Sequence, residues 1–229
     1  MTTIADKLQQ VHERIAQASA RAGRNVADIA LLAVSKTCSP DAVRQAHAAG
    51  QCAFGENYVQ EGVEKIAALR DLALQWHCIG PIQSNKTRLV AENFDWVHTI
   101  DRLKIAERLS AQRPPDKAPL NVCIQVNVDG GTAKSGVAPA DALALAREVA
   151  QLPRVRLRGV MSIPEPASDF ESALSVHQKV RGVFDEIRHA GLPLDTLSIG
   201  MSADLEAAIA AGSTMVRVGT AIFGARNKT

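Results

Sequence analysis

The sequence predicts an α/β fold, namely a single (β/α)8 barrel of the TIM type with one extra N-terminal helix, spanning residues 1–229. Two observations support this prediction. Eight short apolar runs are separated by helix-like or loop segments, and continuous apolar runs are typical of parallel strands buried on both faces. Eight such units fit the length of a compact barrel. A doubly wound open sheet remains the alternative, because counting strands does not show that the sheet closes.

The extra helix is predicted at the start of the chain. Ile4, Leu8, Val11 and Ile15 recur at the spacing of one helix face, and Gly23 follows as the expected end. Charged residues occur throughout this segment, so it does not have the pattern of a signal peptide.

The predicted strands follow in chain order: "IALLAVSK", "CAFGEN", "WHCIG", "WVHTID", "VCIQVNV", "LRGVMSI", "TLSIG" and "MVRVGTAIFG". Helices are predicted between them at "PDAVRQAHAAG", "DRLKIAERLSAQ", "PADALALAREVAQL" and "DFESALSVHQKVRGVFDEIRHAG". The stretch "RPPDKAPL" is interpreted as a loop before the fifth strand rather than a linker, because strand and helix patterns resume on both sides. We therefore expect one domain.

The composition excludes several classes of function. Net charge is +2, with 26 basic and 24 acidic residues, which provides no electrostatic case for binding nucleic acid or an anionic membrane. The four cysteines form no CxxC pair, so reduced thiols in a cytoplasmic protein are expected. His77, His98 and His177 lack metal-ligand spacing and are interpreted as structural or surface residues.

Polar residues end several of the predicted strands. In a parallel barrel the functional groups lie at the carboxyl ends of the strands. Lys36 follows the first strand and Asn57 the second, while Arg217, Gly219 and Thr220 lie within or after the eighth. Further polar residues in equivalent places are Glu56, Asp101, Asn127, Ser162, Ser198 and Ser202. If the barrel closes, all of these residues converge on one mouth.

The stretch "LSIGMSADLEAAIAAGSTMVRVGTAIFG" has the features of an anion site. Ser202, Gly219 and Thr220 supply hydroxyls and accessible backbone N–H groups, and a predicted helix begins just after Ser202. Helix N-termini attract anions, and barrels often bind phosphate after strands seven and eight. The alternative is that these residues only form turns and caps.

Lys36 at a strand end is either a solvated surface lysine or a reactive one. A desolvated lysine has a lowered pKa and can form a Schiff base. A lysine aldimine beside a phosphate site is the pattern of pyridoxal phosphate binding. Arg217 could then face the pyridine nitrogen and disfavour its protonation; its alternative role is a salt bridge at the rim.

Five segments carry a resemblance that runs from Ala33 to Arg226: "AVSKT", "FGENYVQE", "WHCIGPIQSNK", "NVCIQVNVDGGTAKSGV" and "LSIGMSADLEAAIAAGSTMVRVGTAIFGAR". In combination they resemble the pyridoxal phosphate homeostasis protein family, which is similar to the N-terminal barrel of alanine racemase. The resemblance implies that pyridoxal 5'-phosphate is the cofactor and that Lys36 is its aldimine lysine. It also implies the other cofactor-binding residues: Asn57, Ser202, Arg217, Gly219 and Thr220.

The resemblance implies a binding and carrier protein that influences amino-acid and keto-acid balance without robust turnover. Apo forms of enzymes that use this cofactor are the implied partners, and a monomer is expected. The alternative is an enzyme, either racemase-like or a cofactor-free Schiff-base lyase. Alanine racemases add a β domain with a catalytic tyrosine; this chain ends at Thr229, so we expect that domain to be absent, and Tyr58 is the single tyrosine. Lys134 and the segment 84–88 are interpreted as an exposed lysine and an ordinary helix start.

Overall fold

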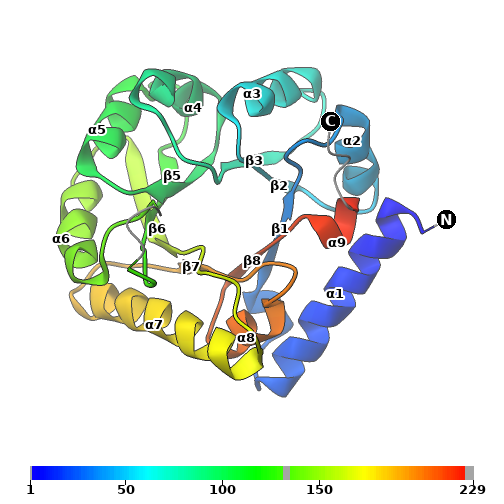
Figure 1. Ribbon diagram of the computed structural model, residues 1–229. Helices are drawn as coiled ribbons and strands as arrows, with labels where there is room; N and C mark the ends of the chain where they lie inside the picture. Colours follow the sequence, from blue (N-terminus) through cyan, green and yellow to red (C-terminus); the bar gives the residue numbers. More distant parts are fainter. Residues whose placement is uncertain (1, 131–134, 225–229) are drawn as a thin grey trace.

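The computed structural model describes residues 2–130 and 135–224. Its strands pair in parallel, each with the next along the chain, and β8 pairs with β1 to close the barrel. Figure 1 shows this ring with the helices outside it. The strands are β1 (Ala30–Val34), β2 (Ala53–Glu56), β3 (Gln75–Cys78), β4 (Trp96–Ile100), β5 (Leu120–Gln125), β6 (Val155–Met161), β7 (Thr196–Ser198) and β8 (Met215–Val218). The barrel prediction is confirmed, and the open sheet is excluded.

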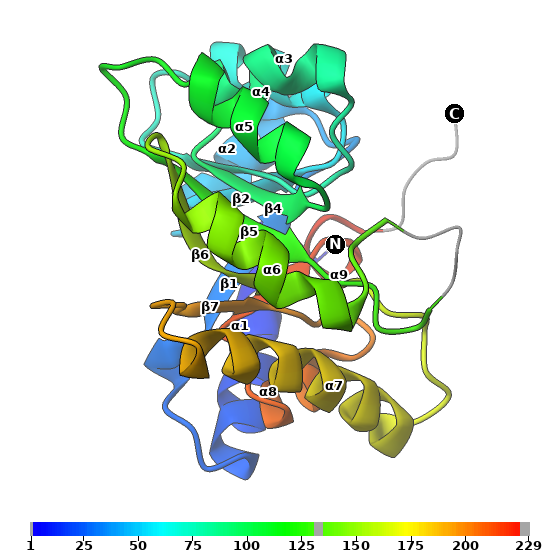
Figure 2. The ribbon, with the colours of Figure 1, turned by 90° about the vertical axis from the view of Figure 1, so that its left-hand side faces the viewer.

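Helices connect successive strands and cover the outside of the barrel (Figure 2). They are α2 (Pro40–Ala48), α3 (Val59–Ala68), α4 (Thr87–Asn93), α5 (Leu103–Gln112), α6 (Pro139–Ala150), α7 (Phe170–His189) and α8 (Leu205–Ala210). Two 3-10 turns, η1 (Val26–Asp28) and η2 (Ser84–Lys86), precede β1 and α4. Within the described part of the chain, no helix combines the length and apolar composition needed to cross a membrane.

The predicted first helix is present as α1 (Ile4–Arg21). Thr3 and Asp6 form a capping box at its start, which satisfies backbone N–H groups that have no partner inside the helix. Its buried face includes Leu8, Val11 and Ile15, as the spacing predicted. This face packs against α8 and α9 (Thr220–Phe223), so the extra helix supports the two elements that follow β7 and β8.

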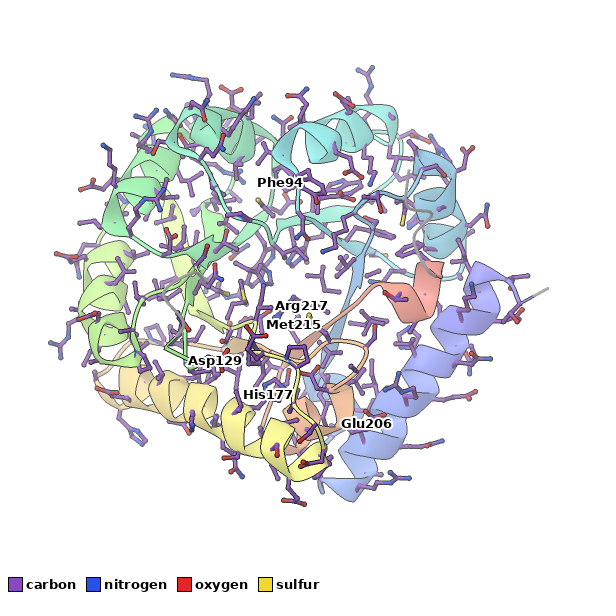
Figure 3. The ribbon with its side chains drawn as sticks, in the orientation of Figure 1. Phe94, Asp129, His177, Glu206, Met215 and Arg217 are labelled. Carbon is purple, nitrogen blue, oxygen red and sulfur yellow. The ribbon has the colours of Figure 1, made fainter. Side chains whose placement is uncertain are left out.

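The core consists of one large cluster and two small ones, one of which is formed by Trp96, Cys123 and Met161. Outward-facing strand residues such as Val216 and Val218 join the large cluster beneath the helices. Leu32, Ile79 and Met215 form a separate, smaller cluster. Figure 3 shows Met215 and Arg217 inside the ring of strands, as the alternation of side chains along β8 requires. The charged side chain of Arg217 therefore lies among the inward-facing residues.

The eighth predicted strand was too long. β8 ends at Val218, and the apolar residues after Gly219 belong to the short helix α9. The N–H groups of Ile222 and Phe223 both donate to the Gly219 carbonyl at 2.9 Å. Continuous hydrophobicity could not reveal this change, because a buried strand and a short buried helix share it.

Candidate functional site

The predicted cofactor residues lie on or just after four neighbouring strands, β7, β8, β1 and β2, with Arg217 within β8 itself. Ala33 of β1 is opposite Val218 of β8, and Val34 is opposite Gly55 of β2. All of the strands are parallel, so the residues just beyond them lie at the same end of the barrel. This closure brings Lys36, Asn57, Ser202, Gly219 and Thr220 to one mouth.

Lys36 lies in a tight turn directly after β1. The Ser35 N–H donates to the Gly55 carbonyl at 3.0 Å, and the Cys38 N–H closes the turn on the Ser35 carbonyl at 3.0 Å. Lys36 is half-buried. Thr37 has a φ of 63°, in the left-handed region. The strand end and the turn together place the lysine at the rim of the barrel.

Arg217 is buried in the barrel interior, at 3% exposure. Its Nη1 donates to the carbonyl and the Oγ of Ser198 at 2.5 and 2.8 Å, and its Nη2 donates to the Ser162 carbonyl at 2.8 Å. These acceptors are uncharged. The hydrogen bonds of Arg217 therefore differ from the rim salt bridge that was considered as its alternative role. Burial lowers the pKa of Arg217 to about 10, which leaves the side chain a cation at neutral pH.

A chain of hydrogen bonds continues inward from Arg217. Ser198 Oγ is 2.9 Å from His98 Nδ1, His98 Nε2 is 2.9 Å from His77 Nδ1, and His77 Nε2 is 3.0 Å from Gln75 Oε1. Arg217 at one end can only donate hydrogen bonds, and Gln75 Oε1 at the other end can only accept one. The donors therefore run in one direction: Arg217 donates to Ser198, Ser198 to His98, His98 to His77, and His77 to Gln75. Burial lowers the pKa of His77 to about 3, and burial also holds the pKa of His98 well below 6.5. Both rings are therefore neutral.

Gly219 lies against the strand that carries Lys36. A Cβ at this position would come within 3.1 Å of the Val34 carbonyl oxygen, so a larger residue would press on β1. Thr220 begins α9. The first N–H groups of a helix have no acceptor within it. The N–H groups of Gly219 and Thr220 therefore lie at the start of α9, beside the strand that leads to Lys36.

The loop that carries Ser202 is held from outside the barrel. Arg14 of α1 donates to the Ser202 carbonyl at 3.1 Å and forms a salt bridge with Glu206 at 2.9 Å. Asp204 accepts from the Met201 N–H at 2.6 Å and contacts His177 Nε2 at 2.9 Å. Burial opposes ionisation of Asp204, but the His177 contact and the Met201 N–H outweigh it, and the pKa of Asp204 is lowered.

Asn57 follows β2 at the same mouth. Its Oδ1 is buried and accepts no hydrogen bond from the residues that the structure describes. The β3 loop approaches its backbone closely, since a Cβ at Gly80 would lie 2.0 Å from the Asn57 carbonyl oxygen. An unsatisfied buried oxygen is costly. A polar ligand at the mouth would satisfy it.

Comparison with known proteins decides the family. Residues 7–227 match the family model of the alanine racemase N-terminal domain. The pyridoxal phosphate homeostasis protein of Pseudomonas aeruginosa is 57% identical over 227 residues, which is 99% of this chain and 97% of that protein. The chain belongs to the pyridoxal phosphate homeostasis protein family.

Solved structures agree with this membership. PipY of Synechococcus elongatus, a family member solved with PLP bound, is 37% identical with a TM-score of 0.82, covering 97% of this chain and all of that one. Alanine racemase of Clostridium difficile has the same barrel at 14% identity and a TM-score of 0.72, over 95% of this chain and 57% of the racemase. The similarity to alanine racemase concerns the fold alone.

The remaining polar residues of the predicted mouth have mainly structural contacts in this member of the pyridoxal phosphate homeostasis protein family. Asp101 pairs with Arg102 at 3.0 Å, Ser162 Oγ donates to the Val126 carbonyl, and the Asn127 N–H donates to the Val137 carbonyl. Lys134 lies outside the described residues. Segment 84–88 forms η2 and the start of α4, as the sequence indicated.

Sequence reasoning did not predict two connections: the ion pairs of the buried Lys65 with Glu56 and Glu61, and the hydrogen bonds that join His77 and His98 inside the barrel. The (i, i+4) spacing of Glu61 and Lys65 is a signal that could have suggested the ion pair between them.

A groove of about 630 Å³ also lies between α1, α8 and the loop before α7. Its lining includes none of the predicted cofactor residues.

Proposed function

We propose that this chain binds pyridoxal 5'-phosphate at the carboxyl ends of β7, β8, β1 and β2 and holds it for exchange with other proteins. The observation that carries the proposal is the juxtaposition of Lys36, Gly219 and Arg217 around the β8–β1 closure. The PLP-bound structure of the PipY relative supports the choice of ligand.

The proposed roles follow from chemistry and position. Lys36 would hold the cofactor through its amine, which can condense with an aldehyde to an imine with loss of water. Ser202, Gly219 and Thr220 bind the phosphate, with backbone N–H groups contributing more than hydroxyls. The three hydrogen bonds of Arg217 use at most three of the five N–H donors of its guanidinium. A remaining donor would be available to the pyridine nitrogen and would disfavour its protonation, and Asn57 would lie beside the ring.

We further propose that the chain is a carrier rather than an enzyme. A cation at the pyridine nitrogen weakens the ring as an electron sink, and Tyr58 is 60% exposed rather than buried over the mouth. Residues 1–229 are proposed to act as one domain and as a monomer. The proposed partners are apo-enzymes that receive the cofactor, and neither nucleic acid nor a membrane is proposed as a partner. The cytoplasmic location stays a prediction.

The test is the absorbance spectrum of protein purified with the cofactor, followed by borohydride reduction and peptide mapping. An imine absorbs in the visible range, and reduction fixes the label on one lysine. We expect that lysine to be Lys36. A protein that shows no visible band, or that carries the reduced label on another lysine, would contradict the proposal.

A further inference from the structure

Lys65, Glu56 and Glu61 form a buried ion cluster, called here the Lys65 cluster. Lys65 of α3 is only 3% exposed. Its Nζ donates to Glu56 Oε1 at 2.9 Å, to Glu61 Oε1 at 2.6 Å and to the Ser35 carbonyl at 2.6 Å. A lysine ammonium has three donors, so each of them has an acceptor here. None of the three cluster residues belongs to the proposed cofactor-binding set.

The cluster contacts the backbone on both sides of Lys36. On one side, Lys65 holds the Ser35 carbonyl, and Ser35 Oγ donates to Glu56 Oε1 at 2.6 Å. On the other side, the Thr37 N–H donates to Glu61 Oε1 at 2.5 Å. The two neighbours of Lys36 are thus fixed by side chains from β2 and α3.

The turn held in this way has a conformation that needs support. Its third residue, Thr37, has a φ of 63°. Turns with a positive φ at that place usually have glycine there, and a β-branched residue in this region is strained. The Lys65 cluster supplies hydrogen bonds at Ser35 and Thr37, on either side of Lys36. It therefore opposes relaxation of the turn into another conformation.

We infer that the Lys65 cluster positions Lys36 for covalent attachment of the cofactor. The inference rests on the proposed function, and it assigns Lys65, Glu56 and Glu61 no contact with the ligand. Attack on a carbonyl carbon requires the amine at about 3–3.5 Å with its lone pair aligned to the carbonyl π orbital, and a displacement of about 1 Å can slow a reaction about 100-fold. A loosened turn should slow attachment while leaving the phosphate and ring contacts in place. A cluster that only ties α3 to the barrel would affect stability alone.

Glu61→Ala is the variant of choice, because the Glu61 side chain is 27% exposed and lines a surface hollow with Thr37 and Cys38, where water can replace the carboxylate. Glu64→Ala is the matched control. Glu64 is exposed on the same helix, borders the same hollow and accepts a hydrogen bond from Gln60 at 3.2 Å, with no contact to the turn among its described bonds.

Two quantities separate positioning from binding: the rate of covalent attachment of pyridoxal 5'-phosphate, followed by stopped-flow absorbance, and the affinity for pyridoxine 5'-phosphate, which lacks the aldehyde. In Glu61→Ala we expect attachment to slow by about 10- to 100-fold, while the affinity for the aldehyde-free compound stays within about twofold. Glu64→Ala should match the wild type in both quantities. Glu61→Gln keeps an acceptor for the Thr37 N–H and should recover most of the rate.

Equal attachment rates in Glu61→Ala and Glu64→Ala would overturn the inference. So would a parallel loss of affinity for pyridoxine 5'-phosphate, which would indicate a damaged binding site. Lys65→Met provides a second test: if the apo-protein melts cooperatively, it must attach the cofactor more slowly. Failure of the wild type to label at Lys36 would refute the proposed function itself, whereas normal labelling at normal rates in Glu61→Ala would refute the positioning role alone.

Discussion

Lys36 is half-buried at a strand end, and its two neighbours in the chain hydrogen-bond to carboxylates, Ser35 to the buried Glu56 and Thr37 to the partly exposed Glu61. In its proposed role, Lys36 needs a fixed backbone and a nucleophilic amine. The turn and the Lys65 cluster supply the first requirement.

We expect Lys36→Ala to lose the visible imine band, because the nucleophile for the aldehyde is removed. The fold should persist, since Lys36 lies in a turn beyond β1 rather than in the apolar core. Some cofactor should remain through phosphate contacts. Absorbance, borohydride labelling and circular dichroism check these expectations. A full band of normal intensity, with the label on another lysine, would show that Lys36 has been misassigned.

At Ser202 we expect substitution by alanine to weaken cofactor retention by about 10- to 100-fold, because a hydrogen bond to a charged acceptor contributes about 1.5–3 kcal/mol. Thr220→Ala keeps its backbone N–H and should have a smaller effect. Equilibrium dialysis with pyridoxal and with pyridoxal 5'-phosphate provides the comparison. If wild-type protein bound both compounds equally well, the phosphate site would be wrongly placed.

At the scale of elements, strands β3, β4, β7 and β8 are linked inside the barrel by the hydrogen-bond chain from Gln75 to Arg217. The chain requires both histidines to be neutral, and it fixes their tautomers. It also fixes the guanidinium of Arg217, because Ser198 accepts from Arg217 while donating to His98.

This chain predicts a pH dependence of stability. The folded-state pKa of His77 is lowered from 6.5 to about 3, so below pH 6.5 the unfolded chain binds a proton that the folded chain does not. Stability is therefore present above pH 6.5 and is lost as the pH falls toward 3, with a slope that approaches about 1.4 kcal/mol per pH unit for one proton. His98 adds to this loss, because its pKa is also lowered.

The measurement is urea unfolding of the apo-protein at several pH values. His77→Gln should reduce the slope between pH 6 and pH 4, since it removes one titrating group, although stability at pH 7 will also fall. His12→Gln is the control, because His12 is exposed on α1. Identical slopes in the wild type and His77→Gln would show that His77 does not titrate on unfolding.

At the scale of the whole molecule, closure of the barrel makes the mouth from residues near both ends of the described chain. Lys36 follows β1 and Thr220 follows β8, and the β1–β8 pairing brings them together. Helix α1 packs outside this seam, and Arg14 reaches the Ser202 loop from it. The architecture therefore places the proposed cofactor site at the seam where the barrel closes.

The whole-molecule prediction is that the loaded protein does not racemise amino acids at a significant rate. Racemisation needs an acid–base group on each face of the substrate Cα. In the proposed site Lys36 can serve one face, whereas Tyr58 is largely exposed, and the proposed contact of Arg217 with the ring nitrogen would disfavour charge delocalisation into the ring. Incubation with L-alanine and other L-amino acids in deuterated water measures enantiomer ratio and Cα deuterium uptake. Racemase-like exchange that disappears in Lys36→Ala would replace the carrier proposal with an enzyme.

The sequence by itself determined the eight strands and the helix α1, because apolar runs and the spacing of Ile4, Leu8, Val11 and Ile15 are local patterns. It also placed Lys36 and Arg217 at or near strand ends, although their roles toward the cofactor stay predictions. Closure, the helix α9 and the Lys65 cluster depended on tertiary structure. Glu56, Lys65 and Ser35 meet only after β1, β2 and α3 have packed, and no periodicity records a contact between Lys65 and a carbonyl 30 residues away. Local patterns encode which face of an element is buried, whereas contacts between distant polar groups are decided by how the elements pack.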